Sequence, residues 1–315
     1  MELLTSILWL ILSLMLLIWG ANRFIDSAST MAGKLGISDF IIGLSVIALG
    51  TSFPEIFVGI SSIVNNTEEI ALGTIVGSNI SNIALIFGVS LIGYSTAINP
   101  SSKRNFIALG LSVLVAIYAL SDLIISKLDS LMLLAVLAYF IYIMAIQPNN
   151  NELTVEQNDS SYLNLSIFLI IGLLSITIGS NYAVINGEKI ALIIGIPKLI
   201  IGLTVLAIGT SLPELAVTIS ALMKQKNQMV LGNIIGSNVL NIAVVMPILG
   251  LFSTKTFDPS IITRDMTVMT ILSLIFVIIA LSFNYKNISI SVYRLMGIIL
   301  VFSYIIYIGI LGGLL

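Results

Sequence analysis

Cysteine and histidine are both absent from this chain of 315 residues. Their absence excludes disulfide bonds, thiolate nucleophiles, imidazole bases and zinc sites built from these two residue types. Charge is also scarce, because only 9% of the residues are Asp, Glu, Lys or Arg, and the net charge is −2. A chain with so few basic residues has no basic face for nucleic acid. The groups left for function are carboxylates, hydroxyls, amides and backbone carbonyls.

Hydrophobic residues, in contrast, make up 58% of the chain, and the mean hydropathy is +1.13. A helix that spans a bilayer needs about 20 mostly apolar residues, and about ten such runs are separated by short polar breaks. The runs cover residues 3–31, 38–64, 69–94, 104–121, 130–147, 163–187, 198–223, 229–252, 266–283 and 290–312. The sequence therefore predicts an all-α integral membrane protein with about ten transmembrane helices.

The orientation of these helices follows from the positions of Lys and Arg. An even number of spans places both termini on one side, and cytoplasmic loops carry the excess of basic residues. With both termini outside, the 13 Lys and Arg residues divide eight to five in favour of the cytoplasmic side. The sequence thus predicts a multi-pass protein of the plasma or inner membrane with its N- and C-termini outside. Met1 and Glu2 precede the first run without a basic segment, which indicates a retained helix instead of a signal peptide.

The chain also contains an internal repeat. GISDFIIGLSVIALGTSFPE at 36–55 matches GIPKLIIGLTVLAIGTSLPE at 195–214, and GTIVGSNISNIA at 73–84 matches GNIIGSNVLNIA at 232–243. Between 36–84 and 195–243, 25 of the 49 positions are identical. Each half holds five predicted spans, so the two halves enter the membrane from opposite sides. We therefore expect a first inverted repeat at 1–147, a cytoplasmic linker at 148–162 and a second repeat at 163–315.

Each repeat carries a proline inside its second span. Pro54 and Pro213 cannot donate a hydrogen bond to the carbonyl four residues earlier, so each helix is expected to break near the midplane. Freed carbonyls must face protein or a hydrated cavity, because lipid cannot hydrogen-bond to them. Inverted repeats with broken helices at the midplane are typical of secondary transporters, whose ion sites use such carbonyls.

A glutamate follows each proline, at Glu55 and Glu214. An acidic side chain at such depth costs about 3 kcal/mol on insertion scales, so its expected partner is a bound cation, or a proton when the site is empty. Hydroxyl and amide side chains in both repeats add further oxygens: Thr51, Ser78, Asn82, Thr210, Ser211, Ser237 and Asn241. Calcium takes six to eight oxygen ligands, whereas magnesium keeps its waters. The set fits Ca²⁺, with Na⁺ able to use the same atoms singly.

Other residues near these motifs have simpler interpretations. Four repeated glycines form small-xxx-small patterns that favour close helix packing: Gly73, Gly77, Gly232 and Gly236. Asn79 and Asn238 are expected to make hydrogen bonds between helices or to lie behind the ligands. Glu68 and Glu69 are expected in a short, solvated loop.

The pairs GTSFPE with GSNISN and GTSLPE with GSNVLN resemble the two alpha-repeats of the sodium/calcium exchangers, in the cation/calcium exchanger superfamily. The resemblance implies an antiporter, not an enzyme, that moves Ca²⁺ against Na⁺ by alternating access as helices 3–31 and 163–187 slide across the core. It implies no cofactor, and no partner beyond the two ions and the lipid bilayer is evident. The implied ligands are Glu55, Glu214, Thr51, Ser52, Thr210, Ser211, Ser78, Asn82, Ser237 and Asn241, with the carbonyls of Ala48 and Ala207.

One position departs from this pattern. Some sodium/calcium exchangers carry Asp where this chain has Asn241, so the site has two carboxylates instead of three. The coupling ion therefore stays open, since the same residues would serve exchange of Ca²⁺ for H⁺ or a K⁺-dependent exchange. A channel is less favoured, because one set of midplane carboxylates suits occlusion better than multi-site conduction. An intramembrane protease would also need two acidic residues, but such dyads rely on Asp and lack the surrounding ligand oxygens.

Overall fold

The computed structural model describes residues 2–93, 103–146, 161–195, 209, 211–283 and 288–313. Within these ranges the chain forms helices and the turns that join them, apart from one isolated bridge between Ile124 and Thr256. In this described part, seven helices are long and apolar enough to cross a membrane, and a bent helix pair makes an eighth span. The prediction of an all-α membrane protein is confirmed at this level.

The first half of the chain opens with the long helix α1 (Glu2–Leu35). Its second span is divided into α2 (Asp39–Ile42), the π-helical η1 (Gly43–Ile47), α3 (Ala48–Thr51) and α4 (Phe53–Val64). Its third span comprises α5 (Glu68–Ser81), the π-helical η2 (Asn82–Phe87) and α6 (Gly88–Gly93). The last two helices of this half are α7 (Lys103–Ala119) and α8 (Lys127–Ile146).

The second half repeats this order as far as it is described. Its helices are α9 (Tyr162–Ile193), α12 (Leu212–Met223), α13 (Asn227–Leu240), the π-helical η4 (Asn241–Val245), α14 (Met246–Phe252), the π-helical η5 (Ile261–Met266), α15 (Thr267–Ser282) and α16 (Ile290–Leu311). α7 has 17 residues and α12 has 12, both shorter than a full span. Most of the predicted linker at 148–162, and the start of the span predicted at 198–223, lie outside the described residues.

The break expected at Pro54 is present. α3 ends before Ser52, whose φ of −85° and ψ of 3° leave the helical region, and α4 begins directly after it. Pro54 then lies in the first turn of α4, where its missing N–H has no helical partner to lose. The two helical parts are bent by 41°. Pro213 holds the same place in α12, after Ser211 with φ −95° and ψ 3°.

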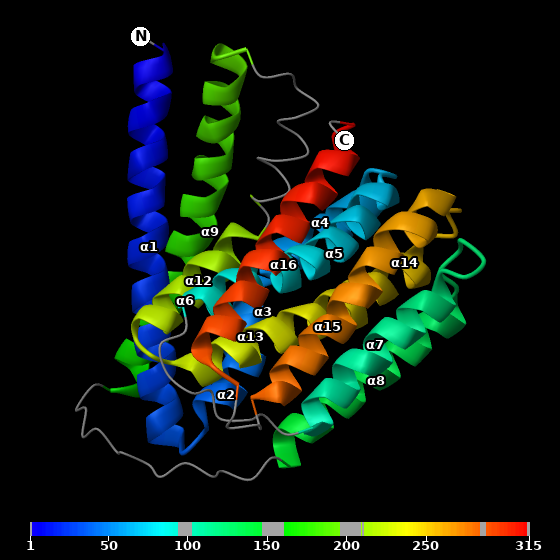
Figure 1. The fold of residues 1–315 in the computed structure, drawn as a ribbon, viewed down its shortest axis with the longest axis horizontal. Coiled ribbons are helices and arrows are strands. Elements are labelled where there is room, and N and C mark those ends of the chain that lie inside the picture. The colour runs from blue at the N-terminus through cyan, green and yellow to red at the C-terminus, as the bar shows by residue number, and fades with distance from the viewer. Residues whose placement is uncertain are drawn as a thin grey trace.

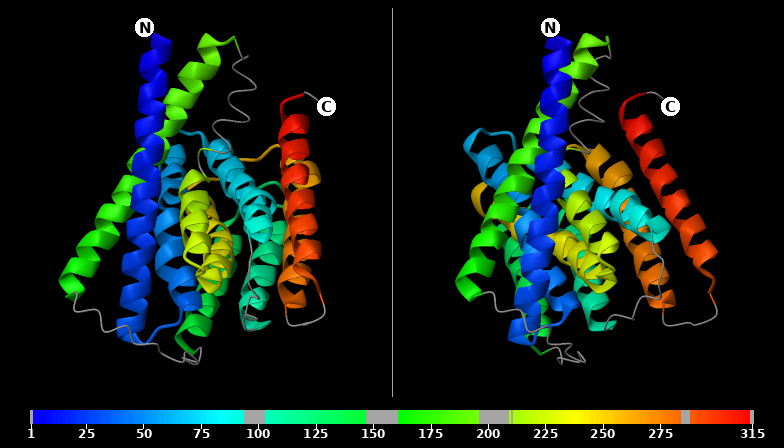
Figure 2. Two further views of the ribbon diagram at one scale, coloured as in Figure 1. Left: turned by 60° about the vertical axis from the view of Figure 1, so that its left-hand side comes forward. Right: turned by 90° about the vertical axis from the view of Figure 1, so that its left-hand side faces the viewer.

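The helices differ strongly in burial. α1 and α9 run side by side along one flank of the molecule (Figures 1 and 2). Only 22% and 33% of their most apolar windows are buried, against 78% for residues 68–93 and 83% for residues 227–252. The third span of each half is therefore enclosed by protein, whereas α1 and α9 present most of their surface to lipid.

Glycine allows the inner helices to touch. A Cβ added at Gly232 or Gly236 would lie 2.3 or 2.4 Å from a backbone carbonyl oxygen of α2 or η1. The packing role predicted for these two glycines is confirmed. A Cβ at Gly73 or Gly77 meets nothing within 4 Å among the described residues. Gly232 and Gly236 pack against residues 40–44. The repeat predicts that Gly73 and Gly77 pack against the equivalent segment, 199–203, which lies outside the described part of the chain.

Glu68 corrects the prediction of a solvated loop. α5 begins at this residue, and its side chain is buried. Ser253 Oγ donates to Glu68 Oε1 at 2.9 Å, and Lys255 Nζ lies 3.9 Å from Glu68 Oε2. The N-terminal end of the α5 dipole and this lysine stabilise the negative charge of Glu68, which the sequence predicted to be solvated by water. Glu69 is exposed, as predicted.

Candidate cation site

Two buried glutamates form the centre of the candidate site. Glu55 lies in the first turn of α4 and Glu214 in the first turn of α12, and their exposed fractions are 2% and 1%. Each therefore lies at a helix N-terminus, where the free N–H groups favour negative charge. In the described part of the chain, neither carboxylate is paired with a Lys or Arg side chain.

Each carboxylate accepts one serine hydroxyl. Ser78 Oγ of α5 donates to Glu55 Oε1 at 3.1 Å, and Ser52 Oγ donates to Glu214 Oε1 at 3.5 Å. The second bond crosses from one repeat to the other. The Oε2 atom of both glutamates is buried without a hydrogen-bond partner among the described residues. A buried carboxylate oxygen in that state is costly, and coordination of a cation would satisfy it.

Asn82 and Asn241 contribute buried amides. Their exposed fractions are 1% and 0%, and neither the side-chain oxygen nor the nitrogen has a hydrogen-bond partner within the described ranges. Each begins a π-helical segment, η2 or η4, inside an otherwise α-helical span. Single-turn π segments inside α-helices are frequently found at functional sites. The two amide oxygens are therefore open to an ion at matching places in the two repeats.

Asn233 in α13 is a buried neighbour that the sequence analysis missed. Its Oδ1 accepts from Thr51 Oγ1 at 3.4 Å and from Ser237 Oγ at 3.5 Å. A hydroxyl that binds a cation through its oxygen has to donate its proton elsewhere, and Asn233 is an acceptor within reach of one hydroxyl from each repeat. For Thr51 the carbonyl of Ile47, at 3.2 Å, is the alternative acceptor. The matching residue of the first repeat is Thr74, which donates to Ile70 O in its own helix at 2.8 Å. Comparison of the repeats overlooked Asn233 because only identical positions stand out.

The backbone and the remaining hydroxyls are in part described. The Ala48 carbonyl accepts the N–H four residues later at 3.0 Å and also lies 3.4 Å from Thr51 Oγ1, so an ion would compete with that hydroxyl for its second lone pair. Ala207 and Thr210 lie outside the described residues. Ser211 Oγ shares a short hydrogen bond with Ser81 Oγ, which joins the end of α5 to the turn before α12. Ser81 lies within the GSNISN motif but is not a predicted ligand, because the second repeat has Leu240 at the matching position.

Among the described residues, Asn79 and Asn238 make hydrogen bonds within their own helices and none between helices. The Nδ2 atom of each donates to the carbonyl four residues earlier in its own helix, at 2.7 and 2.6 Å. Short polar side chains compete for nearby backbone groups in this way, and that local bond has formed here. Both residues are buried beside Ser78 and Ser237, so a place behind the ligands remains their interpretation.

All the predicted ligands that the structure describes are buried: Ala48, Thr51, Ser52, Glu55, Ser78, Asn82, Ser211, Glu214, Ser237 and Asn241. Hydrogen bonds link the two glutamates, one from each repeat, to hydroxyls of the first repeat. Among the described residues, no group of three or more acidic side chains could hold a metal ion. A cation in this site would therefore be held by two carboxylates together with neutral oxygens, a donor set suited to Ca²⁺ or Na⁺.

Comparisons with known proteins identify the family of the chain. A family model described as sodium/calcium exchanger protein matches residues 5–146 and 164–313. A putative antiporter, CaxA of Alkalimonas amylolytica, is 32% identical over 96% of this chain and 98% of its own length. The sodium/calcium exchanger MaX1 of Methanosarcina acetivorans is 31% identical over 97% and 98%. A solved structure of the sodium-calcium exchanger NCX_Mj, soaked with Na⁺ and Sr²⁺, gives a TM-score of 0.81 at 30% identity over 98% of this chain and 99% of that one.

Proposed function

Because the chain belongs to the sodium/calcium exchanger family, we propose that it is a secondary active antiporter that exchanges Ca²⁺ for Na⁺ by alternating access. Family membership makes it a multi-pass membrane protein and a cation/Ca²⁺ exchanger. The choice of Na⁺ as the counter-ion, the ligand set and the mechanism are the proposal.

This proposal rests on two buried carboxylates that have no Lys or Arg partner among the described residues, and on the buried hydroxyl and amide oxygens that both repeats supply. One Ca²⁺ neutralises Glu55 and Glu214, and two Na⁺ do the same. A buried site that is neutral with either load avoids the cost of an uncompensated charge in each state. The proposed ligands are Glu55, Glu214, Thr51, Ser52, Thr210, Ser211, Ser78, Asn82, Ser237 and Asn241, with the carbonyls of Ala48 and Ala207.

The proposed architecture has ten spans in two inverted repeats, 1–147 and 163–315, with the linker 148–162 in the cytoplasm and both termini outside. The similar turns at Ser52 and Ser211 support the repeat, as do the π-helical segments that begin at Asn82 and Asn241. The start of α1 and the end of α16 lie toward the same end of the molecule (Figure 2). An even number of crossings requires that arrangement.

Alternating access is proposed to involve movement of α1 and α9 against the remaining helices. These two pack closely together, since a Cβ at Gly20 would lie 2.7 Å from the Cβ of Ser175. Their largely lipid-facing surfaces leave few protein contacts to rearrange. In this conformation Lys224, which directly follows α12, pairs with Asp26 of α1, and Ser220 Oγ of α12 donates to Asn22 Oδ1 at 2.7 Å. These polar contacts would have to break if α1 moves.

Exchange of Ca²⁺ for H⁺ is the second candidate, and the residue at 241 favours it. With Asn instead of Asp at that position, the acidic ligands are Glu55 and Glu214, and two protons would neutralise them as fully as one Ca²⁺ does. The same carboxylates would then change partner without a change in the charge of the site.

Flux measurements with the purified protein in proteoliposomes separate these functions. Ca²⁺ uptake is measured after imposing a Na⁺, K⁺ or pH gradient, each alone and with the membrane potential clamped. The proposal predicts uptake driven by outward Na⁺ and none with Glu55→Gln. Uptake driven by a pH gradient alone would select the second candidate, and uptake that requires K⁺ together with Na⁺ would assign a K⁺-dependent exchange.

A further inference from the structure

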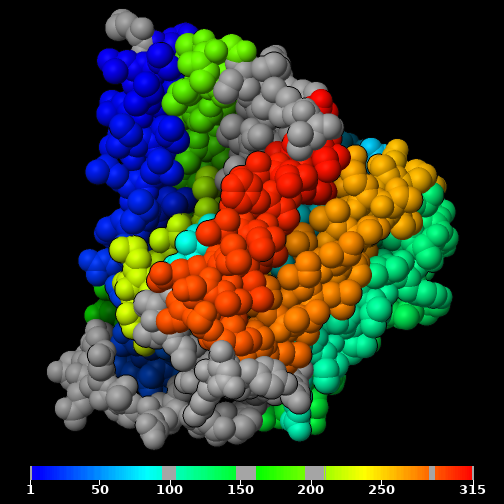
Figure 3. Space-filling view, in the orientation of Figure 1, coloured from blue at the N-terminus to red at the C-terminus, as the bar shows by residue number. Residues whose placement is uncertain are grey.

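An apolar groove runs between α15 and α16, two neighbouring helices on the face of the molecule shown in Figure 3. Its volume is about 500 Å³. α15 lines it between Val268 and Ile279, and α16 lines it between Met296 and Ile310. Ser303 is one of its few polar lining residues, and its hydroxyl donates to Leu300 O in its own helix at 2.6 Å. The groove therefore offers a surface for hydrocarbon.

The length of the groove corresponds to one leaflet of a bilayer. Val268 and Ile279 are eleven residues apart, which is about 16 Å at about 1.5 Å per residue. The hydrocarbon core of a bilayer is about 30 Å thick, so a leaflet is about 15 Å. The groove is therefore long enough for one acyl chain of a single leaflet.

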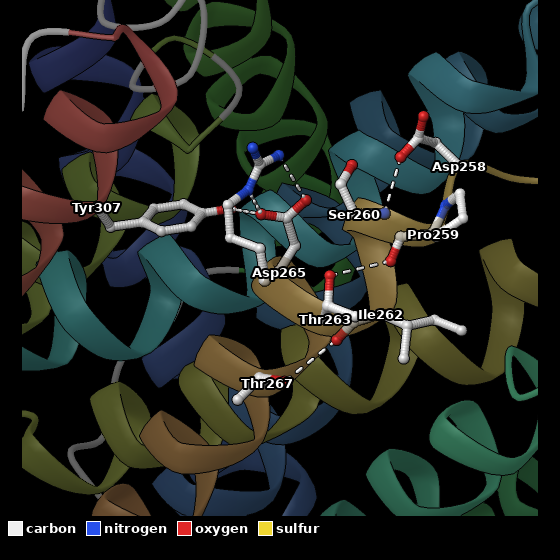
Figure 4. A network of polar contacts seen from close by, with 9 residues as sticks. Asp258, Pro259, Ser260, Ile262, Thr263, Asp265, Thr267 and Tyr307 are labelled. Atoms are coloured by element: carbon white, nitrogen blue, oxygen red, sulfur yellow. Dashed lines mark hydrogen bonds and ion pairs between the residues drawn. The ribbon is translucent and has the colours of Figure 1, made fainter.

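A polar cluster lies near one end of the groove, and Figure 4 shows two of its residues, Asp265 and Tyr307. Arg264 of η5 lies one turn before Val268, and its Nε and Nη2 donate to Asp265 Oδ1 and Oδ2 at 2.7 and 3.0 Å. Tyr307, which lines the groove from α16, donates its hydroxyl to Asp265 Oδ1 at 3.0 Å. Figure 4 shows Tyr307 reaching toward Asp265, so the cluster joins the two helices that form the groove.

The Arg264 side chain retains capacity for another ligand. A guanidinium group has five N–H donors, and Asp265 takes two of them. The side chain is 42% exposed, so part of it can be reached from outside the protein. Arginine binds phosphate oxygens through parallel N–H bonds, which makes phosphate a suitable partner at this end of the groove.

We propose that this groove binds a phospholipid of the surrounding leaflet, with one acyl chain between α15 and α16 and the phosphate on Arg264. A phospholipid combines an apolar chain and an anionic phosphate in one molecule, and the groove presents the matching surfaces in the same order. Asp265 and Tyr307 act as positioning residues that hold the guanidinium at the end of the groove. The site shares no residue with the proposed cation site, so it does not depend on the transported ions.

Native mass spectrometry of the full-length protein tests the headgroup contact. The protein is delipidated in detergent and titrated with phosphatidylglycerol, phosphatidylethanolamine, or diacylglycerol with the same chains and no phosphate. One phospholipid is expected to bind per chain, and diacylglycerol about tenfold more weakly, the loss of one hydrogen bond to a charged group. Arg264→Gln is expected to weaken phospholipid binding by a similar factor and to leave diacylglycerol binding unchanged. Arg294→Gln, at the other, exposed end of α16, is the matched control and should change neither.

A second variant tests the groove itself. Ile275→Trp fills it and is expected to reduce binding of phospholipid and diacylglycerol alike, with folding checked by gel filtration and thermal unfolding. Equal binding of the two lipids to the wild type, or undiminished phospholipid binding by Arg264→Gln, would overturn the headgroup contact, and an unaffected Ile275→Trp would overturn the groove. Because the chain has no cysteine, Ile299→Cys reports on a second copy: a disulfide-linked dimer in native membranes would show that protein, not lipid, covers this face.

Discussion

The two repeats match where they supply candidate ligands and differ in the residues behind them. In both repeats, a glutamate lies in the first turn of the helix that follows the break, and an asparagine is the first residue of the π-helical segment of the next span. Behind these ligands, Asn233 of the second repeat accepts hydroxyls from both halves, whereas its counterpart Thr74 bonds to its own helix. Duplication therefore preserves the ligands themselves, while their supporting contacts diverge. Two halves of one site need not contribute equally to binding.

Removing either carboxylate is expected to have the largest effect on Ca²⁺ binding. The two substitutions should have similar effects, because each repeat contributes one glutamate to the proposed site. Glu55→Gln and Glu214→Gln are each expected to weaken Ca²⁺ binding more than about 100-fold, since the remaining charge cannot neutralise a dehydrated divalent ion. Calorimetric Ca²⁺ titration of the purified variants provides the measurement. Glu69→Gln, which removes an exposed carboxylate, is the control and should bind as the wild type does. Near-normal binding by either site variant, correctly folded, would rule out a shared site.

Protons should compete with Ca²⁺ for both glutamates together. Protonation removes negative charge and ligand oxygens, so Ca²⁺ binding weakens as pH falls. Even glutamates with the ordinary pKa of about 4.3 would be largely protonated at pH 4, which predicts at least about a tenfold loss of affinity between pH 7 and pH 4. Ca²⁺ titrations over this range, with circular dichroism to confirm the fold, test the expectation. An affinity that does not change with pH would exclude carboxylates as the ligands.

A third carboxylate at either Asn241 or Asn82 tests whether these two positions of the repeats are equivalent. Asn241→Asp would leave a Ca²⁺-loaded site at −1 and a site with three Na⁺ neutral, so Na⁺ binding should gain relative to Ca²⁺ by about tenfold. Asn82→Asp places the same charge in the first repeat and should have a similar effect. Dissociation constants for both ions between pH 6 and pH 9 provide the measurement. A gain in Ca²⁺ over Na⁺ across that range would show that the charge balance assigned to this position is mistaken.

The smallest expected effect concerns the residue in which the repeats differ. Asn233→Thr makes the second repeat like the first and removes an acceptor shared by Thr51 and Ser237. Ion binding is expected to weaken about fivefold, as for the loss of one hydrogen bond. Thr74→Asn is the reciprocal change and should leave affinity within about twofold, because Thr74 bonds only within its own helix among the described contacts. If the two variants had equal effects, the asymmetry between the repeats would have no role in binding.

The sequence predicted those features that depend on local chemistry. Apolar runs of sufficient length predicted the helices, and Pro54 predicted the break, because a proline has no backbone N–H to donate within a helix. The burial of Glu55 and Glu214 followed from their position inside apolar spans. These inferences require only the residue, its neighbours along the chain and the membrane.

Features that depend on contacts between distant segments were not predictable in this way. Glu68 is buried because Ser253 and Lys255 lie beside it, far along the chain. The hydrogen bond between Ser81 and Ser211 joins positions without a shared motif. Asn233 escaped notice because its role has no counterpart in the other repeat. Comparison of the two repeats therefore finds the residues that both share, and it does not find residues such as Asn233 that occur in one repeat alone.

Competition between Na⁺ and Ca²⁺ for the purified protein tests the shared two-carboxylate site most directly. Equilibrium dialysis with radioactive Ca²⁺ would be carried out at increasing Na⁺ concentrations and constant ionic strength, maintained with an organic cation. The account predicts that one Ca²⁺ binds per chain and that Na⁺ displaces it completely. At least two Na⁺ are needed to neutralise Glu55 and Glu214, so the displacement of Ca²⁺ should depend more steeply on Na⁺ concentration than binding of a single Na⁺ would. Ca²⁺ that stays bound at saturating Na⁺ would contradict the account, because the two ions would then occupy separate sites.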